Sequence, residues 1–212
     1  MAERGRPRAF DRDLALRRAM RVFWEKGYAG ASLADLKEAM GINGPSLYAA
    51  FGCKEALFEE AVDLYADLEG TQLWAHFGEA PTAREGMAAL LRASAETYTD
   101  PARPHGCMVV LGALVGGEAE AKVAAGLARR RQDGIAQMTA RLAADVAAGR
   151  LSAGIDCRAI ATFYTTVQMG MSLQARDGAS RETLLAVADA AMAAWDNLVR
   201  PVDPFKPRIF PA

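Results

Sequence analysis

The stretch SLADLKEAMGINGPSLYAAF, residues 32–51, decides how the first part of this chain folds. It predicts two short helices. The first begins at the capping box Ser-x-x-Asp of residues 32–35, in which a hydroxyl and an acidic side chain satisfy free amides of the first turn, and it ends at Gly41. The second begins at Pro45, because the first helical turn does not need the missing N–H, and it ends at Gly52. Two short helices joined by a tight glycine turn are typical of a helix-turn-helix.

A third helix is predicted before this pair. Asp11 is placed to cap it and Gly27 to end it. Between them, apolar residues recur at the i, i+3, i+4, i+7 spacing of one helix face, namely Leu16, Ala19, Met20 and Phe23. Longer helices are predicted further along the chain, over 54–78, 82–99, 118–148, 156–176 and 180–199, with an apolar stretch at 107–115. No segment alternates like a strand, so we expect an all-α protein.

Glycine and proline divide the chain into three parts. Residues 1–53 are expected to form an N-terminal three-helix helix-turn-helix domain preceded by a basic arm. Residues 54–200 are expected to form a larger helical domain. Residues 201–212 form a tail rich in proline, which we expect to be extended or disordered.

The composition is that of a globular protein, with 51% hydrophobic and 24% charged residues. No run approaches the roughly 18 uncharged apolar residues of a membrane span. The first residues are basic and polar, which does not fit a secretory signal. The three cysteines are scattered and odd in number, which favours a reducing compartment over a disulfide framework. We therefore expect a cytoplasmic protein with no membrane partner.

The charge is distributed unevenly. Residues 1–54 carry ten basic and six acidic side chains, although the whole chain has 25 basic and 26 acidic ones. A basic first quarter on an acidic body indicates that this quarter binds a polyanion, unless the excess is a chance fluctuation. Arg4, Arg6 and Arg8 form a basic arm of the kind that enters a minor groove, or else a solubilising tail.

The first sixty residues resemble the DNA-binding domain of TetR/AcrR-family transcriptional regulators. The resemblance rests on Phe23 with Gly27-Tyr28, and on the segments SLADL (32–36), GI (41–42), LYAAF (47–51) and KEAL (54–57). It implies a homodimer formed through the last two long helices, and a ligand cavity in the C-terminal domain. One departure is Cys53, where members often carry a serine, and the thiol is expected to cost the next helix its cap.

The resemblance and the chemistry of the residues together predict a set of DNA contacts: Arg6, Ser32, Asn43, Gly44, Pro45, Ser46, Tyr48, Ala49 and Lys54. Tyr48 follows the inward-facing Leu47, so its hydroxyl is expected to face a phosphate oxygen. Lys54 begins a helix, where its charge is unfavourable unless an anion such as a DNA phosphate lies close. Ser32 is first a helix cap and also a neighbour of the DNA backbone.

The start of the second short helix has few side chains suited to reading bases. Asn43 either reads an adenine or only satisfies its turn, and both interpretations stay open. Gly44, Pro45 and Ala49 are small and apolar, so they suit thymine methyl groups but not polar base edges. Direct base readout is therefore expected to be limited.

The C-terminal half is less informative. Candidate ligand contacts are Met108, Leu111, Met138, Phe163 and Met169, since methionine adapts to varied apolar ligands, although such residues also fill ordinary cores. Candidate dimer contacts are Phe163, Val167, Trp195 and Leu198. His105 and Cys107 form an H-x-C pair that suits a soft metal but lacks companion ligands, so no metal site is predicted.

The sequence therefore predicts a DNA-binding transcriptional regulator, a repressor that leaves its operator when a small molecule binds. Its expected partners are double-stranded operator DNA, a second copy of the chain and an unidentified small-molecule effector, with no cofactor. One alternative is an architectural or activating DNA-binding protein that needs no ligand, and it would have a filled C-terminal core. Another is an all-helical enzyme, which is disfavoured because no H-E-x-x-H, G-x-S-x-G or phosphate-loop pattern occurs.

Overall fold

The computed structural model describes residues 10–113 and 120–201. Within these ranges every regular element is a helix, which confirms the predicted all-α class. The elements are α1 (Arg12–Gly30), α2 (Leu33–Met40), α3 (Gly44–Phe51), α4 (Lys54–Tyr65), the π-helical turn η1 (Ala66–Gly70), α5 (Thr71–Glu79), α6 (Ala83–Tyr98), α7 (Met108–Leu111), α8 (Ala121–Ala147), α9 (Cys157–Arg176), α10 (Arg181–Ala193) and α11 (Trp195–Leu198).

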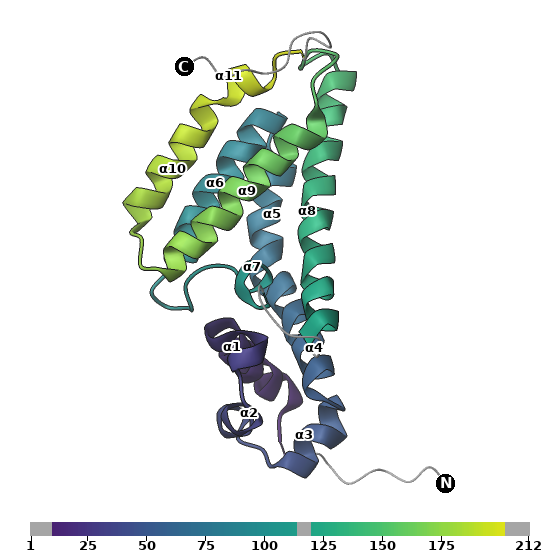
Figure 1. The fold of residues 1–212 in the computed structure, drawn as a ribbon, viewed down its shortest axis with the longest axis vertical. Coiled ribbons are helices and arrows are strands. Elements are labelled where there is room, and N and C mark those ends of the chain that lie inside the picture. Colours follow the sequence, from purple (N-terminus) through teal and green to yellow (C-terminus); the bar gives the residue numbers. More distant parts are fainter. Residues whose placement is uncertain (1–9, 114–119, 202–212) are drawn as a thin grey trace, which may run out of the picture.

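The molecule is elongated, with α1, α2 and α3 at its lower end (Figure 1). From there α4 leads upward to a bundle formed by α5, α6, α8, α9 and α10. The short α7 lies between the two parts and contacts α1, α4, α8 and α9. All helix-turn-helix residues that the structure describes are therefore at one end, and α4 and α7 connect them to the bundle.

The lower core is aromatic and joins α1 to α4. The ring of Phe58 meets Phe23 edge-on with centroids 5.0 Å apart, and it meets Tyr28 at 5.2 Å. Trp24 packs in the same manner on Tyr65 at 4.8 Å. Edge-to-face pairs add about 0.5–1.5 kcal/mol each beyond their burial. The start of the predicted second domain is thus packed into the first, and the domain boundary at residue 53 stays a prediction.

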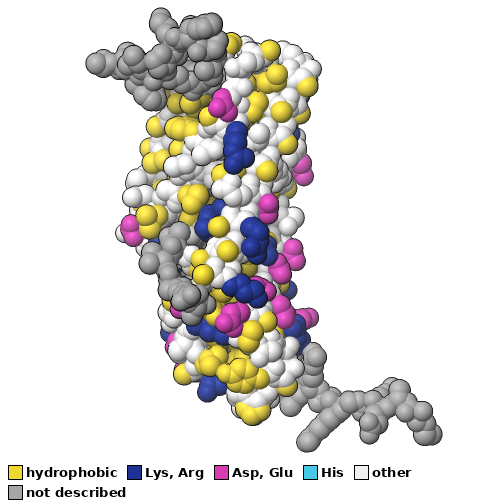
Figure 2. All heavy atoms as spheres, turned by 45° about the vertical axis from the view of Figure 1, so that its right-hand side comes forward, with side chains coloured by type: hydrophobic (Ala, Val, Ile, Leu, Met, Phe, Trp, Pro, Cys, Tyr) yellow, Lys and Arg dark blue, Asp and Glu magenta, His cyan; other side chains and the backbone are white. Residues whose placement is uncertain are grey.

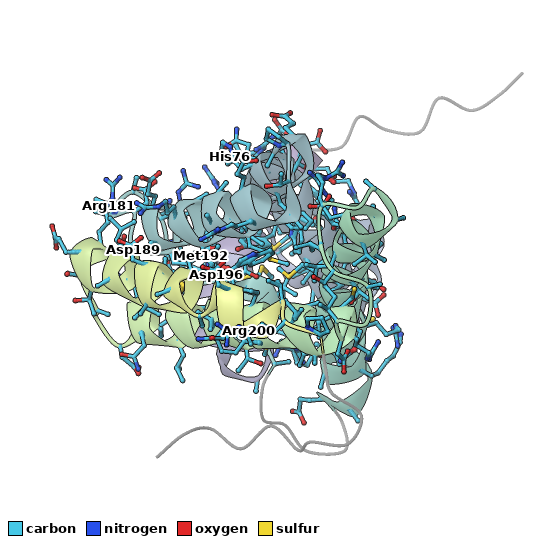
Figure 3. All side chains as sticks on the ribbon, turned by 90° about the horizontal axis from the view of Figure 1, so that it is seen from above. His76, Arg181, Asp189, Met192, Asp196 and Arg200 are labelled. Atoms are coloured by element: carbon cyan, nitrogen blue, oxygen red, sulfur yellow. The ribbon has the colours of Figure 1, made fainter. Side chains whose placement is uncertain are left out.

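The upper core lies under α10 and α11, which three ion pairs connect to α6, two from α10 and one from α11. The pairs are Arg84–Asp196, Arg92–Asp189 and Arg181–Glu96. Figure 3 labels Arg181, Asp189 and Asp196 along this edge of the bundle. Exposed pairs contribute little stability, about 0–1 kcal/mol each, so we assign them to orienting α10. Beneath them Trp195 and Tyr164 are both buried, with ring centroids 5.8 Å apart.

The predicted helix over 54–78 is confirmed in that residues 54–79 are helical, but it is divided into α4 and α5 by the π-helical turn η1. Gly70 has no side chain to stabilise a regular turn there, and the Thr71 hydroxyl donates to the carbonyl of Ala66 at 3.4 Å. The predicted helix over 180–199 is also divided, at Ala194, into α10 and α11. The helices α6, α9 and α10 begin with caps at Thr82, Asp156 and Ser180, each of which accepts a hydrogen bond from a backbone amide of its own first turn.

Gly27 interrupts α1 as predicted, although the helix resumes as far as Gly30. Its backbone is left-handed in φ (φ +70°, ψ 173°), a conformation that glycine adopts most easily. The break turns the amide of Tyr28 away from the helix, and this amide donates to the carbonyl of Gly112 at 2.7 Å. The interruption therefore connects α1 to the segment that follows α7.

None of the helices among the described residues has the length and apolar character needed to cross a membrane. In the same ranges, no three His, Cys, Asp or Glu side chains come close enough together to hold a metal ion. His105 and Cys107 thus have no companion ligands within the part of the chain that the structure describes.

Candidate DNA-binding surface and ligand cavity

The helix α3 presents its apolar side to the core and a nearly uncharged side to solvent. Leu47 and Phe51 are 1% and 4% exposed, whereas Tyr48 is 50% exposed, so Tyr48 points away from the core as predicted. Pro45 and Ala49 are exposed beside it. In Figure 2, hydrophobic side chains gather at the lower end of the molecule with Lys and Arg side chains close by. The exposed phenol of Tyr48 is suited to contact a DNA phosphate, and the small residues beside it would let α3 come close to a DNA groove.

The two polar caps of the helix-turn-helix use part of their hydrogen-bonding capacity locally. The Oδ1 atom of Asn43 accepts from the amide of Ser46 at 2.9 Å. Bidentate reading of adenine needs both Oδ1 and the amide nitrogen, and here one lone pair of Oδ1 is already used while the nitrogen is free to donate. The Ser32 hydroxyl donates to Asp35 Oδ2 at 2.7 Å while its oxygen accepts from the Asp35 amide at 3.1 Å. The primary role of both side chains is therefore to cap the first turns of their helices.

Lys54 lies over an aromatic ring at the start of α4. Its Nζ atom is 4.4 Å from the centroid of the Tyr28 ring. Burial lowers the pKa of Lys54, an effect that Glu120 and Glu55 oppose. The adjacent Cys53 caps the helix through Sγ, which accepts from the amide of Ala56 at 3.4 Å, so the expected loss of a cap is wrong. A thiol is only a weak acceptor, however.

Three basic residues near α3, the second helix of the helix-turn-helix and its recognition helix, were missed by sequence reasoning. Arg12 pairs with Glu60 at 2.7 Å and lies 4.4 Å above the ring of Phe51, so it holds the end of α3 against α4. Arg18 and Lys37 flank the turn between α2 and α3: a Cβ atom on Gly41 would lie 3.6 Å from Arg18 Nη1. The sequence shows that these three residues are charged, but it does not show that they lie close to α3. Arg6, with the rest of the basic arm, lies outside the described residues.

A cavity of about 440 Å³ opens where η1 interrupts the line of α4 and α5. This volume is within the usual range of small-molecule sites, about 300–1,000 Å³. Its wall combines apolar side chains with several polar ones. Its lining residues include Tyr65, Asp67, Glu69, Leu73, Trp74, Tyr98, Cys107, Val109, Arg130, Arg131, Asp133, Gly134 and Met169.

Polar groups converge on Cys107 in this wall. Both Tyr65 and Tyr98 are buried and hydrogen-bond with the Cys107 side chain. Burial raises the pKa of both phenols well above the usual value, and Cys107 raises them further, so both are neutral donors at physiological pH. The amide of Cys107 donates to Ser172 Oγ at 2.8 Å. This residue thus links the cavity wall to α9.

The predicted ligand contacts are only partly brought together. Met169 lines the cavity. Met108 and Met138 are fully buried in the core, and neither they, nor Leu111, nor Phe163 is part of its wall. The wall depends instead on residues of η1, α5 and α8 that no sequence motif marked.

One segment, residues 99–112, joins the cavity to the DNA-binding helices. Its carbonyls at Gly106 and Gly112 accept from Trp24 Nε1 at 3.0 Å and from the Tyr28 amide at 2.7 Å. The same segment contributes Cys107 and Val109 to the cavity wall. From α9, Arg176 donates to the carbonyls of Trp24 and Glu25 at 2.7 and 2.8 Å. A change in the cavity wall therefore has a short hydrogen-bonded connection to α1.

The predicted dimer contacts lie at different depths. Trp195 is only 3% exposed and is part of the upper core, which leaves it little surface for a partner. Phe163, Val167 and Leu198 are half-buried. The large apolar side chains that project from α9 and α10 are Leu173 and Val187, 46% and 38% exposed.

Comparison with known proteins agrees with this architecture. The family model described as bacterial regulatory proteins, tetR family, matches residues 15–61. Over 93% of this chain and 94% of the relative, the sequence is 35% identical to the HTH-type transcriptional repressor ComR of Escherichia coli. It is 31% identical to the HTH-type transcriptional repressor BdcR of the same organism, over 88% of this chain and 90% of the relative.

A solved structure is also similar over nearly the whole chain. It is a cysteine mutant of the TetR family transcriptional regulator CifR in complex with 26-bp double-stranded operator DNA. The sequences are 49% identical, the TM-score is 0.87, and the match covers 90% of this chain and 100% of the other. With a helix-turn-helix of the same architecture at one end of an all-helical body, this chain belongs to the TetR family of bacterial regulatory proteins and is a DNA-binding transcriptional regulator.

Proposed function

We propose that this protein is a repressor that binds an operator as a homodimer and leaves it when a small molecule enters the cavity at η1. The observation that carries the proposal is the position of this cavity. Its wall includes Cys107 and Val109, and the same segment holds α1 through the carbonyls of Gly106 and Gly112. A ligand that prefers another arrangement of this segment would shift the position of α1, and only such a difference in affinity changes DNA binding.

The DNA contacts proposed are those of the α2–α3 end. Tyr48 and Lys54 supply phosphate contacts, Asn43 supplies one amide donor, and Arg18 and Lys37 add charge beside the turn. The relatives named as repressors and the operator complex of CifR support this assignment. We place the protein in the cytoplasm, where bacterial DNA lies.

The homodimer is proposed to form through α9 and α10. Their outer faces carry Leu173 and Val187 among small residues, which lets two helix pairs approach closely. A two-fold dimer presents two recognition helices about 34 Å apart, one turn of DNA.

A regulator that needs no ligand is disfavoured by the cavity. That alternative predicts a filled C-terminal core, whereas about 440 Å³ is open beside Tyr98 and Met169. No catalytic step is part of the proposal, because DNA binding and its release by a ligand need none.

The test is fluorescence anisotropy with DNA flanking the protein's own gene, against scrambled DNA of equal length. We expect flank-specific binding that weakens steeply between about 0.05 and 0.2 M salt, because each phosphate contact releases counterions. Tyr48→Phe and Lys54→Ala should each weaken binding, whereas Arg84→Ala serves as the matched charge control, because Arg84 lies beside α11 at the opposite end of the molecule from α3 (Figure 1). Equal binding to both DNAs, or no effect of the two α3–α4 variants, would contradict the proposal.

A further inference from the structure

Arg131 is a cation in the cavity wall that lacks an acidic partner among the residues that the structure describes. Its neighbour Arg130 pairs with Asp63, and Arg103, near the cavity mouth, pairs with Glu69. Arg131 instead donates through Nη1 to the carbonyl of Val109 at 2.8 Å. A guanidinium has five donors, so most of its hydrogen-bonding capacity is available to a ligand.

The surroundings of Arg131 favour a negatively charged partner. The side chain is half-buried, and burial lowers its pKa, which shows that its charge is partly desolvated, although the neighbouring Cys107 opposes the shift. A guanidinium nevertheless stays protonated in proteins, so it gains most from an anion that restores the lost solvation. The planar fork of arginine matches a carboxylate in two parallel hydrogen bonds.

The rest of the wall suits an apolar body. Leu73, Trp74 and Met169 line the cavity, and a Cβ atom on Gly134 would lie only 3.2 Å from the Trp74 ring. Of the acidic residues in the wall, Glu69 is paired with Arg103, whereas Asp67 and Asp133 are exposed, so water and salt screen them. Arg131 therefore attracts an anionic ligand at short range, and the exposed carboxylates repel it only weakly.

We propose that the effector is a small organic anion, with a carboxylate bound by Arg131 and an apolar body packed against Leu73, Trp74 and Met169. The volume of about 440 Å³ limits it to a small molecule. The inference rests on the proposed function, since it names the chemical class of the ligand for the same cavity.

This binding mode would also couple ligand binding in the cavity to DNA binding by the helices at the other end. A carboxylate bound in two parallel hydrogen bonds fixes the plane of the guanidinium, and rotation of that plane toward the ligand would break the bond from Nη1 to the carbonyl of Val109, which is 2.8 Å long. Val109 lies in the segment whose carbonyls at Gly106 and Gly112 hold Trp24 and Tyr28 of α1. Release of Val109 therefore loosens the segment that positions the DNA-binding helices.

The experiment uses carboxylates of about four to ten carbons, linear and aromatic, each paired with its primary amide. Binding is followed by tryptophan fluorescence, because Trp74 lies in the wall, and Trp74→Phe identifies its signal. Operator release is followed by anisotropy in the same samples. The variants are Arg131→Gln and, as a matched control on the same helix and in the same wall, Arg130→Gln.

We expect at least one acid to bind the unmodified protein about tenfold more tightly than its amide, and to release operator DNA. This preference should vanish in Arg131→Gln and persist in Arg130→Gln. The ligand-free Arg131→Gln protein is checked for an unchanged circular dichroism spectrum, and Arg131→Lys should restore part of the preference if misfolding is not the cause.

Equal binding of acids and amides, a preference that survives Arg131→Gln, or no binding by any acid up to millimolar concentration would overturn the inference. These results are distinct from failure of the proposed function. Specific operator binding without any acid effect contradicts only the ligand class, whereas absence of specific operator binding contradicts the repressor itself.

Discussion

Replacing Gly106 with alanine should destabilise the protein, because this glycine has both an unusual backbone conformation and no space for a side chain. Its φ is +79°, in the left-handed region. A Cβ atom there would lie 2.7 Å from the carbonyl oxygen of Ser172 and 2.7 Å from Cδ1 of Leu111. The leucine can rotate away, but the backbone oxygen of α9 cannot, so the segment between α6 and α7 has to move.

The expected loss is the sum of two effects. Left-handed backbone costs a non-glycine residue about 1–2 kcal/mol, and forced overpacking costs about 1–3 kcal/mol. Gly106→Ala should therefore lower the free energy of unfolding by roughly 2–5 kcal/mol. Gly178→Ala is the matched control: its φ is +94°, but a Cβ atom there would meet nothing within 4 Å. In that variant the free energy of unfolding should fall only by the cost of the left-handed backbone, about 1–2 kcal/mol.

The assay is urea unfolding followed by circular dichroism, at one protein concentration because dimerisation couples stability to concentration. Gly106→Ala should also weaken operator binding, since the carbonyl of Gly106 holds Trp24 at 3.0 Å. Equal losses in the two variants would refute the reasoning, because the close approach to Ser172 would then carry no cost.

Two further predictions concern stability and assembly. Burial alone would raise the pKa of Asp145, but hydrogen bonds from Arg150 and from the amide of Ala83 outweigh it, so its folded pKa lies below the usual value. This stabilisation is present above the unfolded pKa of about 4 and is lost as the pH falls through the folded value. Asp145→Asn should therefore cost about 1.5–3 kcal/mol in urea unfolding at pH 7 and much less at pH 3; a loss independent of pH would contradict the charge argument. Leu173→Glu or Val187→Glu should convert the dimer to monomer in analytical ultracentrifugation, and an unchanged sedimentation coefficient in both would place the interface elsewhere.

Short-range chemistry made the helix-turn-helix predictable. Capping by Ser32, Asn43 and Thr82 depends on residues three positions apart, so it can be read directly from the chain. The exposure of Tyr48 follows from its place after the buried Leu47. Local signals of this kind are independent of the rest of the fold.

The ligand cavity could not be predicted in the same way. Met108 and Met138 are residue types that suit a cavity wall, but they are packed in the core. Arg131 and Trp74 line the cavity, although nothing in the sequence distinguishes them from other helix residues. Which side of a long helix faces empty space depends on how several helices pack together. That information lies in contacts between residues far apart in the chain.

By itself, the sequence determined the helical class, the helix-turn-helix with its caps and the residues that α3 exposes, because helix periodicity and capping act over a few residues. Only the tertiary structure decided where the cavity opens, the absence of an acidic partner for Arg131 among the described residues, and the connection from Val109 through Gly106 and Gly112 to α1. Each of these depends on long-range packing, in which a side chain's role is set by neighbours that the order of residues does not reveal.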